Sequence, residues 1–179
     1  MKKFFVWLSI LFLFAVPAMA QAQEISEIDW EDWKGGLDVT ATHGDFIDIE
    51  EAGIRLFIPE LVKPMDLPEA LSGKGYLAYY RSDDYSMMII ISKETAEGKT
   101  PADYVEEMRG YIPEIELTGQ YKINGIDAAV FEDPSHDERD CILKPSEEFL
   151  IRVSVQPVSE YVALMLSDFV FASVQMLSD

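Results

Sequence analysis

The residues best suited to chemistry lie in one short segment, residues 133–141, which reads Asp-Pro-Ser-His-Asp-Glu-Arg-Asp-Cys. This segment combines an imidazole, several carboxylates and a thiol, which are the ligand types that zinc uses in proteins. Ligands crowded into one loop lack the spacing across two elements that usually closes a tetrahedral site. We therefore interpret the segment as a solvated hairpin loop and keep a metal site as the alternative. Its candidate ligands are His136, Asp137, Asp140 and Cys141.

The same segment offers a thiol dyad of Cys141 with His136, because a neighbouring base can activate a cysteine. No flanking lysine and no second cysteine favours the thiolate, so an inert strand cysteine is the simpler interpretation. The chain also has no Gly-x-Ser-x-Gly segment to present a serine nucleophile. No catalytic residue is therefore assigned. A metal-dependent or thiol hydrolase centred on residues 136–141 remains the alternative to a binding function.

Four tyrosines form the second group of interest. Strand alternation predicts that Tyr76 and Tyr80 lie on one face of a strand and Tyr79 on the other. Packing into a core is the simpler interpretation for one face, whereas the other face could form an aromatic platform for a ligand. The candidate ligand-binding residues are Tyr76, Tyr79, Tyr80 and Tyr85.

The elements that must position these groups are mostly paired strands. Short apolar runs alternate with turn residues, and the Asn124-Gly125 dipeptide is the strongest hairpin signal because both residues tolerate positive φ. The predicted strands cover residues 46–50, 54–58, 76–81, 86–92, 121–123, 126–132, 140–144 and 148–156.

Two helices complete the pattern. One begins at Pro101 with Thr100 as its N-cap, and the last runs from an N-cap at Ser159 to about Leu177. The order of strand pairs, helix, strand pairs and helix predicts an α+β fold: an antiparallel sheet of about six to eight strands flanked by helices. This order differs from that of a doubly wound nucleotide-binding fold. The final helix is apolar almost all round, so an oligomeric subunit that buries its back is a further possibility.

Three segments of this pattern resemble the PsbP-like family. They are residues 53–59 (Gly-Ile-Arg-Leu-Phe-Ile-Pro), residues 123–129 (Ile-Asn-Gly-Ile-Asp-Ala-Ala), and the strand 149–155 with the helix 161–174. The resemblance covers residues 45–177 and implies an α/β/α sandwich, with a non-enzymatic role in binding or assembling other proteins. It carries over no functional residue, because the matching positions are those of the fold.

The N-terminus reads as an export signal. Lys2 and Lys3 precede a 13-residue stretch, residues 4–16, that is apolar apart from one serine, and small residues follow it. A membrane span needs about 20 apolar residues, so this stretch is too short for a permanent anchor. Cleavage is expected after Ala20, or alternatively after Ala22. The mature protein is then soluble and periplasmic or secreted.

The domain plan that follows is a signal peptide at residues 1–20, an acidic N-terminal segment at 21–44 and a single PsbP-like domain at 45–179. In the acidic segment, Trp30 and Trp33 are three apart and could dock on the domain from one helical face.

Charge and cysteine content limit the partners. Without residues 1–20 the chain has 33 acidic and 12 basic side chains and no basic stripe. Nucleic acids and anionic lipids are therefore excluded as partners, since their phosphates require clustered lysine and arginine.

Cys141 is the only cysteine, so no internal disulfide forms. We expect a protein or small-molecule partner in the cell envelope, no cofactor, and an oligomeric state that the sequence does not determine.

Overall fold

The computed structural model describes residues 25–177. The expected export signal and both cleavage positions lie outside the described residues.

The main sheet has eight strands in the order β1-β7-β8-β9-β10-β6-β5-β4. Every neighbouring pair is antiparallel except β1 and β7, which are parallel. The predicted α+β class and its antiparallel sheet are confirmed, with one short parallel strand added at an edge. The strands are β1 (Ser26–Ile28), β4 (Lys63–Pro64), β5 (Tyr76–Arg81), β6 (Met88–Thr95), β7 (Glu116–Ile123), β8 (Ile126–Asp133), β9 (Glu138–Lys144) and β10 (Phe149–Gln156).

A second sheet of three strands contains the first predicted hairpin. Strands β2 (Gly44–Ile49) and β3 (Ile54–Pro59) pair antiparallel across the short 3-10 turn η1 (Glu50–Ala52). The C-terminal strand β11 (Gln175–Met176) pairs with the other side of β3. The hairpin therefore packs over the main sheet and does not extend it.

The two predicted helices are present, and α3 (Pro101–Arg109) begins as expected. Its Thr100 hydroxyl accepts from the Asp103 N–H, and the Asp103 carboxylate accepts from the Thr100 N–H. The cap predicted for the last helix is wrong: α4 (Tyr161–Ala172) begins after Glu160 without a side-chain cap, because the Ser159 hydroxyl donates to another loop. The predicted end of the last helix near Leu177 is also wrong, because that helix ends at Ala172 and Gln175–Met176 pair with β3 as a strand. The remaining helices are α1 (Trp30–Trp33) and α2 (Gly35–Thr40). Within residues 25–177, no helix combines the length and apolar character that crossing a membrane would require.

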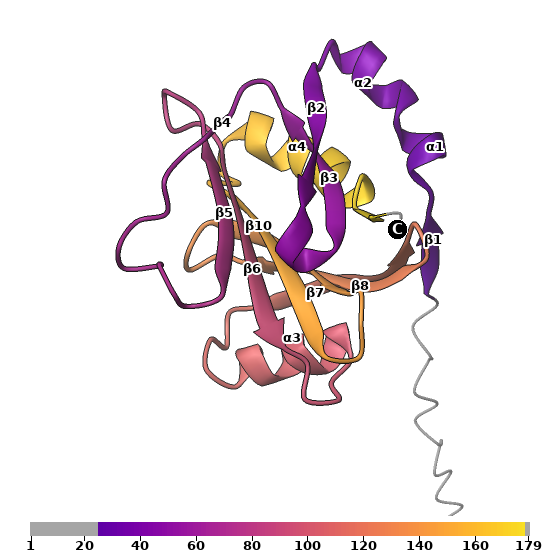
Figure 1. Ribbon diagram of the computed structural model, residues 1–179, viewed down its shortest axis with the longest axis vertical. Helices are drawn as coiled ribbons and strands as arrows, with labels where there is room; N and C mark the ends of the chain where they lie inside the picture. Colours follow the sequence, from indigo (N-terminus) through magenta and orange to yellow (C-terminus); the bar gives the residue numbers. More distant parts are fainter. Residues whose placement is uncertain (1–24, 178–179) are drawn as a thin grey trace, which may run out of the picture.

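Both faces of the main sheet are covered. On β10, Ile151 and Val153 face a large core shared with α4 and the small sheet, whereas Leu150 faces a smaller core under α3. Figure 1 shows α4 and the small sheet on one side of the main sheet and α3 on the other. The even-numbered residues of β10 therefore face α3.

The acidic N-terminal segment is integrated with these layers. Trp30 is buried, with its ring edge-on to Phe46 at 5.5 Å and stacked with Phe57 at 6.1 Å. The Trp30 backbone N–H also donates to Asn124 Oδ1 at 2.8 Å. The Asn124 amide donates to the carbonyl of Ala172, the last residue of α4, and to that of Val174 just beyond the helix. The expected docking of Trp30 is confirmed, and Asn124 joins it to the C-terminal helix.

Candidate functional site

A cavity of about 200 Å³ lies on the α3 side of the main sheet. Strands β5, β6, β9 and β10 contribute its floor, and the end of α3 forms an apolar wall. Typical small-molecule pockets measure roughly 300–1,000 Å³, so this one suits a ligand of side-chain size. Its lining residues are Tyr76, Ile90, Ser92, Met108, Ile112, Asp133, His136, Glu138, Arg152 and Ser154.

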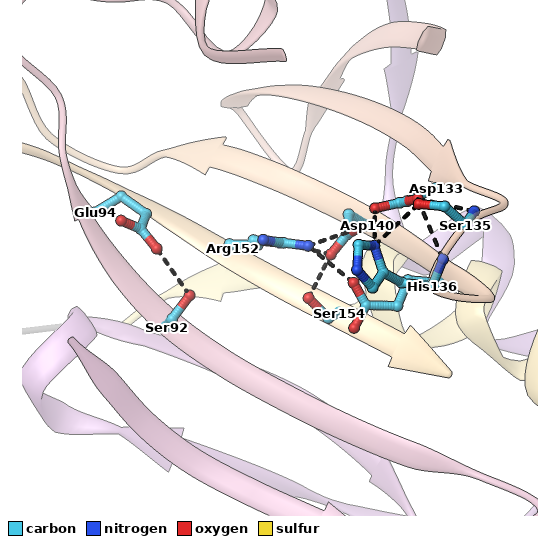
Figure 2. Close-up of polar contacts among 9 residues, drawn as sticks. Ser92, Glu94, Asp133, Ser135, His136, Asp140, Arg152 and Ser154 are labelled. Carbon is cyan, nitrogen blue, oxygen red and sulfur yellow. Dashed lines mark hydrogen bonds and ion pairs between the residues drawn. The ribbon is translucent and has the colours of Figure 1, made fainter. Parts of the chain in front are cut away.

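The floor of the cavity is built on a pair between Arg152 of β10 and Asp140 of β9. Arg152 Nε donates to Asp140 Oδ1 at 2.7 Å, and Arg152 Nη2 donates to Oδ2 at 3.1 Å. Ser154 also donates its hydroxyl to Asp140, whose side chain is completely buried. Figure 2 shows Arg152 pointing along the strands toward this carboxylate. Burial alone would lower the pKa of the guanidinium, but Asp140 and Glu138 raise it above its ordinary value, so Arg152 stays charged.

Glu138 is the second acid that reaches Arg152. Its Oε2 accepts from Arg152 Nη2 at 3.0 Å, and its side chain is only 16% exposed. Burial and the charge of Asp140 raise the pKa of Glu138 above its ordinary value, although Arg152 opposes the shift. The residues around Glu138 therefore balance the negative charge of its ionised carboxylate only in part.

An acid–imidazole pair lies at the rim. His136 Nδ1 and Asp133 Oδ2 are 2.7 Å apart, and Ser135 also donates to Asp133 (Figure 2). The bond to Asp133 and the charge of that carboxylate raise the pKa of His136. Burial works against ionisation of Asp133, yet hydrogen bonds from Ser135 and His136 hold its pKa below the ordinary value. With Nδ1 occupied, Nε2 of the neutral ring is left available as a base.

The loop that carries His136 is fixed from its other end by Asp137. The Asp137 carboxylate accepts from the Ser159 N–H at 2.8 Å and from the Ser159 hydroxyl, and its backbone oxygen accepts from Val158. The interpretation of residues 133–141 as a solvated hairpin loop applies only to residues 134–137, because Asp133 ends β8 and residues 138–141 belong to β9. Asp133 and Asp140 are both buried.

The structure does not bring the four candidate metal ligands together. His136 pairs with Asp133, Asp137 binds Ser159, and Asp140 binds Arg152. Cys141 is buried in the large core on the α4 side, and this burial raises the pKa of its thiol. Within residues 25–177, no group of three or more His, Cys, Asp or Glu side chains could hold a metal ion.

The tyrosines are arranged differently from the predicted alternation. A β-bulge between Tyr76 and Ala78 adds one residue to β5, so Tyr76 pairs with Ser92 while Tyr80 pairs with Ile89. Ser92 faces the cavity and Ile89 faces the large core, so the prediction that Tyr76 and Tyr80 share a face is wrong.

Only Tyr76 lines the cavity. Tyr79 pairs with Ile90 on the same face of the sheet and hydrogen-bonds Met88 Sδ at 3.5 Å. Tyr80 is buried in the large core. Tyr85 is exposed, and the centroid of its ring lies 4.1 Å from the Arg81 guanidinium carbon. The four tyrosines therefore do not form one platform.

Arg152 lies outside the segment that the sequence indicated as best suited to chemistry, whereas Asp133 and Glu138 lie inside it but were not among its candidate ligands. The available signal was the alternation of β10, where Arg152 and Ser154 occupy one face while the other face is aliphatic. An arginine on an inner strand of a sheet that has helices on both sides requires a buried acidic partner. Asp140 in the preceding strand provides it.

Neither a protein-family model nor a curated protein matches this chain. Solved structures match its fold. The solution structure of the cyanobacterial PsbP, CyanoP, from Synechocystis sp. PCC 6803 gives a TM-score of 0.51 at 10% identity, covering 74% of this chain and 91% of that chain. The crystal structure of the Ran-binding protein Mog1p from Saccharomyces cerevisiae gives a TM-score of 0.50 at 7% identity. The match covers 76% of this chain and 97% of that chain. The chain therefore has a PsbP-like fold, as the resemblance in its sequence implied.

Proposed function

We propose that the protein is an exported, non-enzymatic binding or assembly domain of the cell envelope, and that the cavity on the α3 side is its binding site. The observation that carries the proposal is the buried Arg152–Asp140–Glu138 network on the cavity floor. Such a network costs desolvation energy and rarely stabilises a fold better than apolar packing would. Its position beside a cavity supports a role in ligand recognition.

The state of the nucleophilic groups near the site supports binding rather than catalysis. The Cys141 thiol is buried on the opposite side of the sheet, and the Ser154 hydroxyl is committed to Asp140. Among solved proteins with this fold, Mog1p is a Ran-binding protein. A protein-binding role for the present chain is compatible with that precedent.

Export is proposed from residues 1–22 alone. The basic start, the apolar stretch and the Ala-x-Ala pattern place cleavage after Ala20 or Ala22. Cell fractionation with N-terminal sequencing tests this part: the mature chain should begin at Gln21 or Gln23. An intact N-terminus in the cytoplasmic fraction would contradict export.

Site-directed photo-cross-linking tests the binding role. Tyr111 is 81% exposed and lies directly before Ile112 of the cavity wall, so a p-benzoylphenylalanine in its place samples the rim. The matched control replaces Tyr161, which is 75% exposed and starts α4 on the opposite side of the sheet. We expect a discrete adduct in envelope extract from position 111 and none from position 161. Equal labelling from both positions, or none from either, would reject the cavity as the binding face.

The Asp133–His136 pair favours one second candidate, a hydrolase in which His136 acts as a base. Its metal-dependent form would need ligands that residues 25–177 do not bring together around His136. Thermal melts with zinc or calcium, compared between the wild type and His136→Ala, test the metal form. A rise in melting temperature with metal that the variant loses would support it, and the absence of such a rise would reject it.

A further inference from the structure

We propose that the cavity binds a primary ammonium or guanidinium group that is carried on a short alkyl chain. This inference rests on the proposed binding function and specifies the chemistry of the ligand. Such a group is present in a lysine or arginine side chain of a protein partner and in a small aliphatic amine.

The charges around the cavity favour a cation. Asp133, Glu138 and Asp140 contribute three carboxylates, and Arg152 contributes one permanent positive charge. The sum is −2 with His136 neutral and −1 with His136 protonated. Because the site is partly closed to water, a carboxylate ligand would meet a repulsive field and an alkylammonium an attractive one.

Glu138 provides the acceptor that the incoming group needs. Its Oε2 accepts from Arg152, and no donor within residues 25–177 hydrogen-bonds its Oε1. The oxygens of Asp140 already accept from Arg152 and Ser154, and those of Asp133 accept from Ser135 and His136. A bound cation would complete the compensation of the Glu138 charge, which its neighbours leave partly unbalanced.

The rest of the lining fits an alkyl chain. Met108 at the end of α3 and Ile112 give the cavity an apolar side opposite the charged floor, and Ile90 of β6 adds an apolar side chain to the floor itself. Methionine adapts to chains of different shape. The volume of about 200 Å³ accommodates a group the size of a lysine side chain with several waters, since each water occupies about 30 Å³.

Long-range electrostatics act in the same direction. The whole chain carries a formal charge of −19, which attracts cations and repels anions during encounter. Association should therefore weaken as the salt concentration rises.

Isothermal titration of the mature protein tests the inference with matched probes. n-Butylamine and agmatine carry the proposed group, n-butanol and butyrate have a similar chain with no charge or a negative one, and ethylamine shortens the stem. We expect binding of n-butylamine and agmatine, at least about tenfold weaker binding of ethylamine, and no binding of butanol or butyrate. A capped pentapeptide with one central lysine distinguishes a protein side chain from a free amine as the source.

Variants locate the site. Glu138→Gln should weaken the binding of n-butylamine at least about tenfold, since a hydrogen bond to a charged group contributes that much. The control Glu147→Gln removes the same charge from an 89% exposed side chain in another loop and should leave affinity unchanged. Equal effects of the two variants would show nonspecific charge attraction and overturn the inference.

The remaining outcomes separate this inference from the proposed function. Binding of butyrate or butanol in place of the amines would overturn the cationic ligand but leave the cavity as a binding site. No binding of any probe would also overturn the cationic ligand, whereas cross-linking at Tyr111 tests the binding role independently.

Discussion

Arg152 and Asp140 form a two-point contact across strands β10 and β9, with Nε–Oδ1 at 2.7 Å and Nη2–Oδ2 at 3.1 Å. The carboxylate is completely buried and the arginine side chain is 19% exposed. Paired charges of this kind fix the floor of the cavity, since neither group can move without leaving the other unsolvated.

Removal of Arg152 should therefore destabilise the fold strongly. Arg152→Ala leaves Asp140 buried without its partner, and we expect a loss of about 3–5 kcal/mol in the free energy of unfolding. Urea denaturation measures this loss. Lys63→Ala is the control, because the Lys63–Asp83 pair is exposed on both sides and should contribute less than about 1 kcal/mol. Similar losses in the two variants would contradict a buried, structurally essential pair.

Glu138→Gln should leave stability equal or higher at neutral pH. The folded-state pKa of Glu138 is raised, so the folded state binds more protons than the unfolded state between pH 4.5 and that raised pKa. The stability of the wild type therefore falls as pH rises through this window, and the variant lacks this loss. Melting temperatures should match near pH 4 and favour the variant at pH 7.5.

A lower melting temperature for Glu138→Gln at pH 7.5 would show that ionised Glu138 stabilises the fold. The predicted result would instead show that the carboxylate is retained at a cost in stability, as is common for functional groups.

The pKa of His136 should depend on Asp133. NMR titration of the imidazole is expected to give a value above 6.5 in the wild type and a lower value in Asp133→Asn. Because the folded-state pKa is raised, the stability from this contact is complete below pH 6.5 and is lost as pH rises through the raised pKa. Asp137→Asn is the control, since that carboxylate binds Ser159. A larger effect of the Asp137 variant would contradict the assigned pair.

Asn124 should hold the N-terminal helix in place. Asn124→Gly keeps the tolerance for the observed φ of 47° but removes hydrogen bonds to Trp30, Ala172 and Val174. We expect a loss of about 1–3 kcal/mol in the free energy of unfolding. In a Trp33→Phe background without residues 1–20, which contain Trp7, the fluorescence of Trp30 should shift to the red. Asp127→Ala in the same hairpin is the control. Unchanged fluorescence in the glycine variant would contradict this role.

Local signals in the sequence were sufficient for much of the fold. The Asn124-Gly125 turn was predictable because both residues adopt positive φ, at 47° and 84°. The start of α3 was predictable because Thr100 and Pro101 have capping preferences that act within one turn. Strand β1 had no such signal, since it has three residues, and two of them are polar.

The site depended on tertiary contacts that local patterns do not contain. One bulge residue in β5 reverses the face of every residue beyond it, so a strict period of two assigned Tyr80 to the wrong side relative to Tyr76. Ser159 has the residue type of an N-cap, yet Asp137, which is 22 positions away, engages its hydroxyl. Arg152 became a site residue only because α3 covers its face of the sheet.

Amide NMR spectra of the mature chain, recorded with a mixed set of small amines, carboxylic acids and alcohols, test most directly whether the cavity is the binding site. We expect shifts confined to amides around the cavity, including those of Ser92, Glu138 and Arg152. These shifts should be lost in the folded cavity-filling variant Ser92→Trp and kept in Ser72→Trp, which alters an exposed loop. Shifts centred elsewhere, or shifts that survive in folded Ser92→Trp, would contradict the cavity as the binding site.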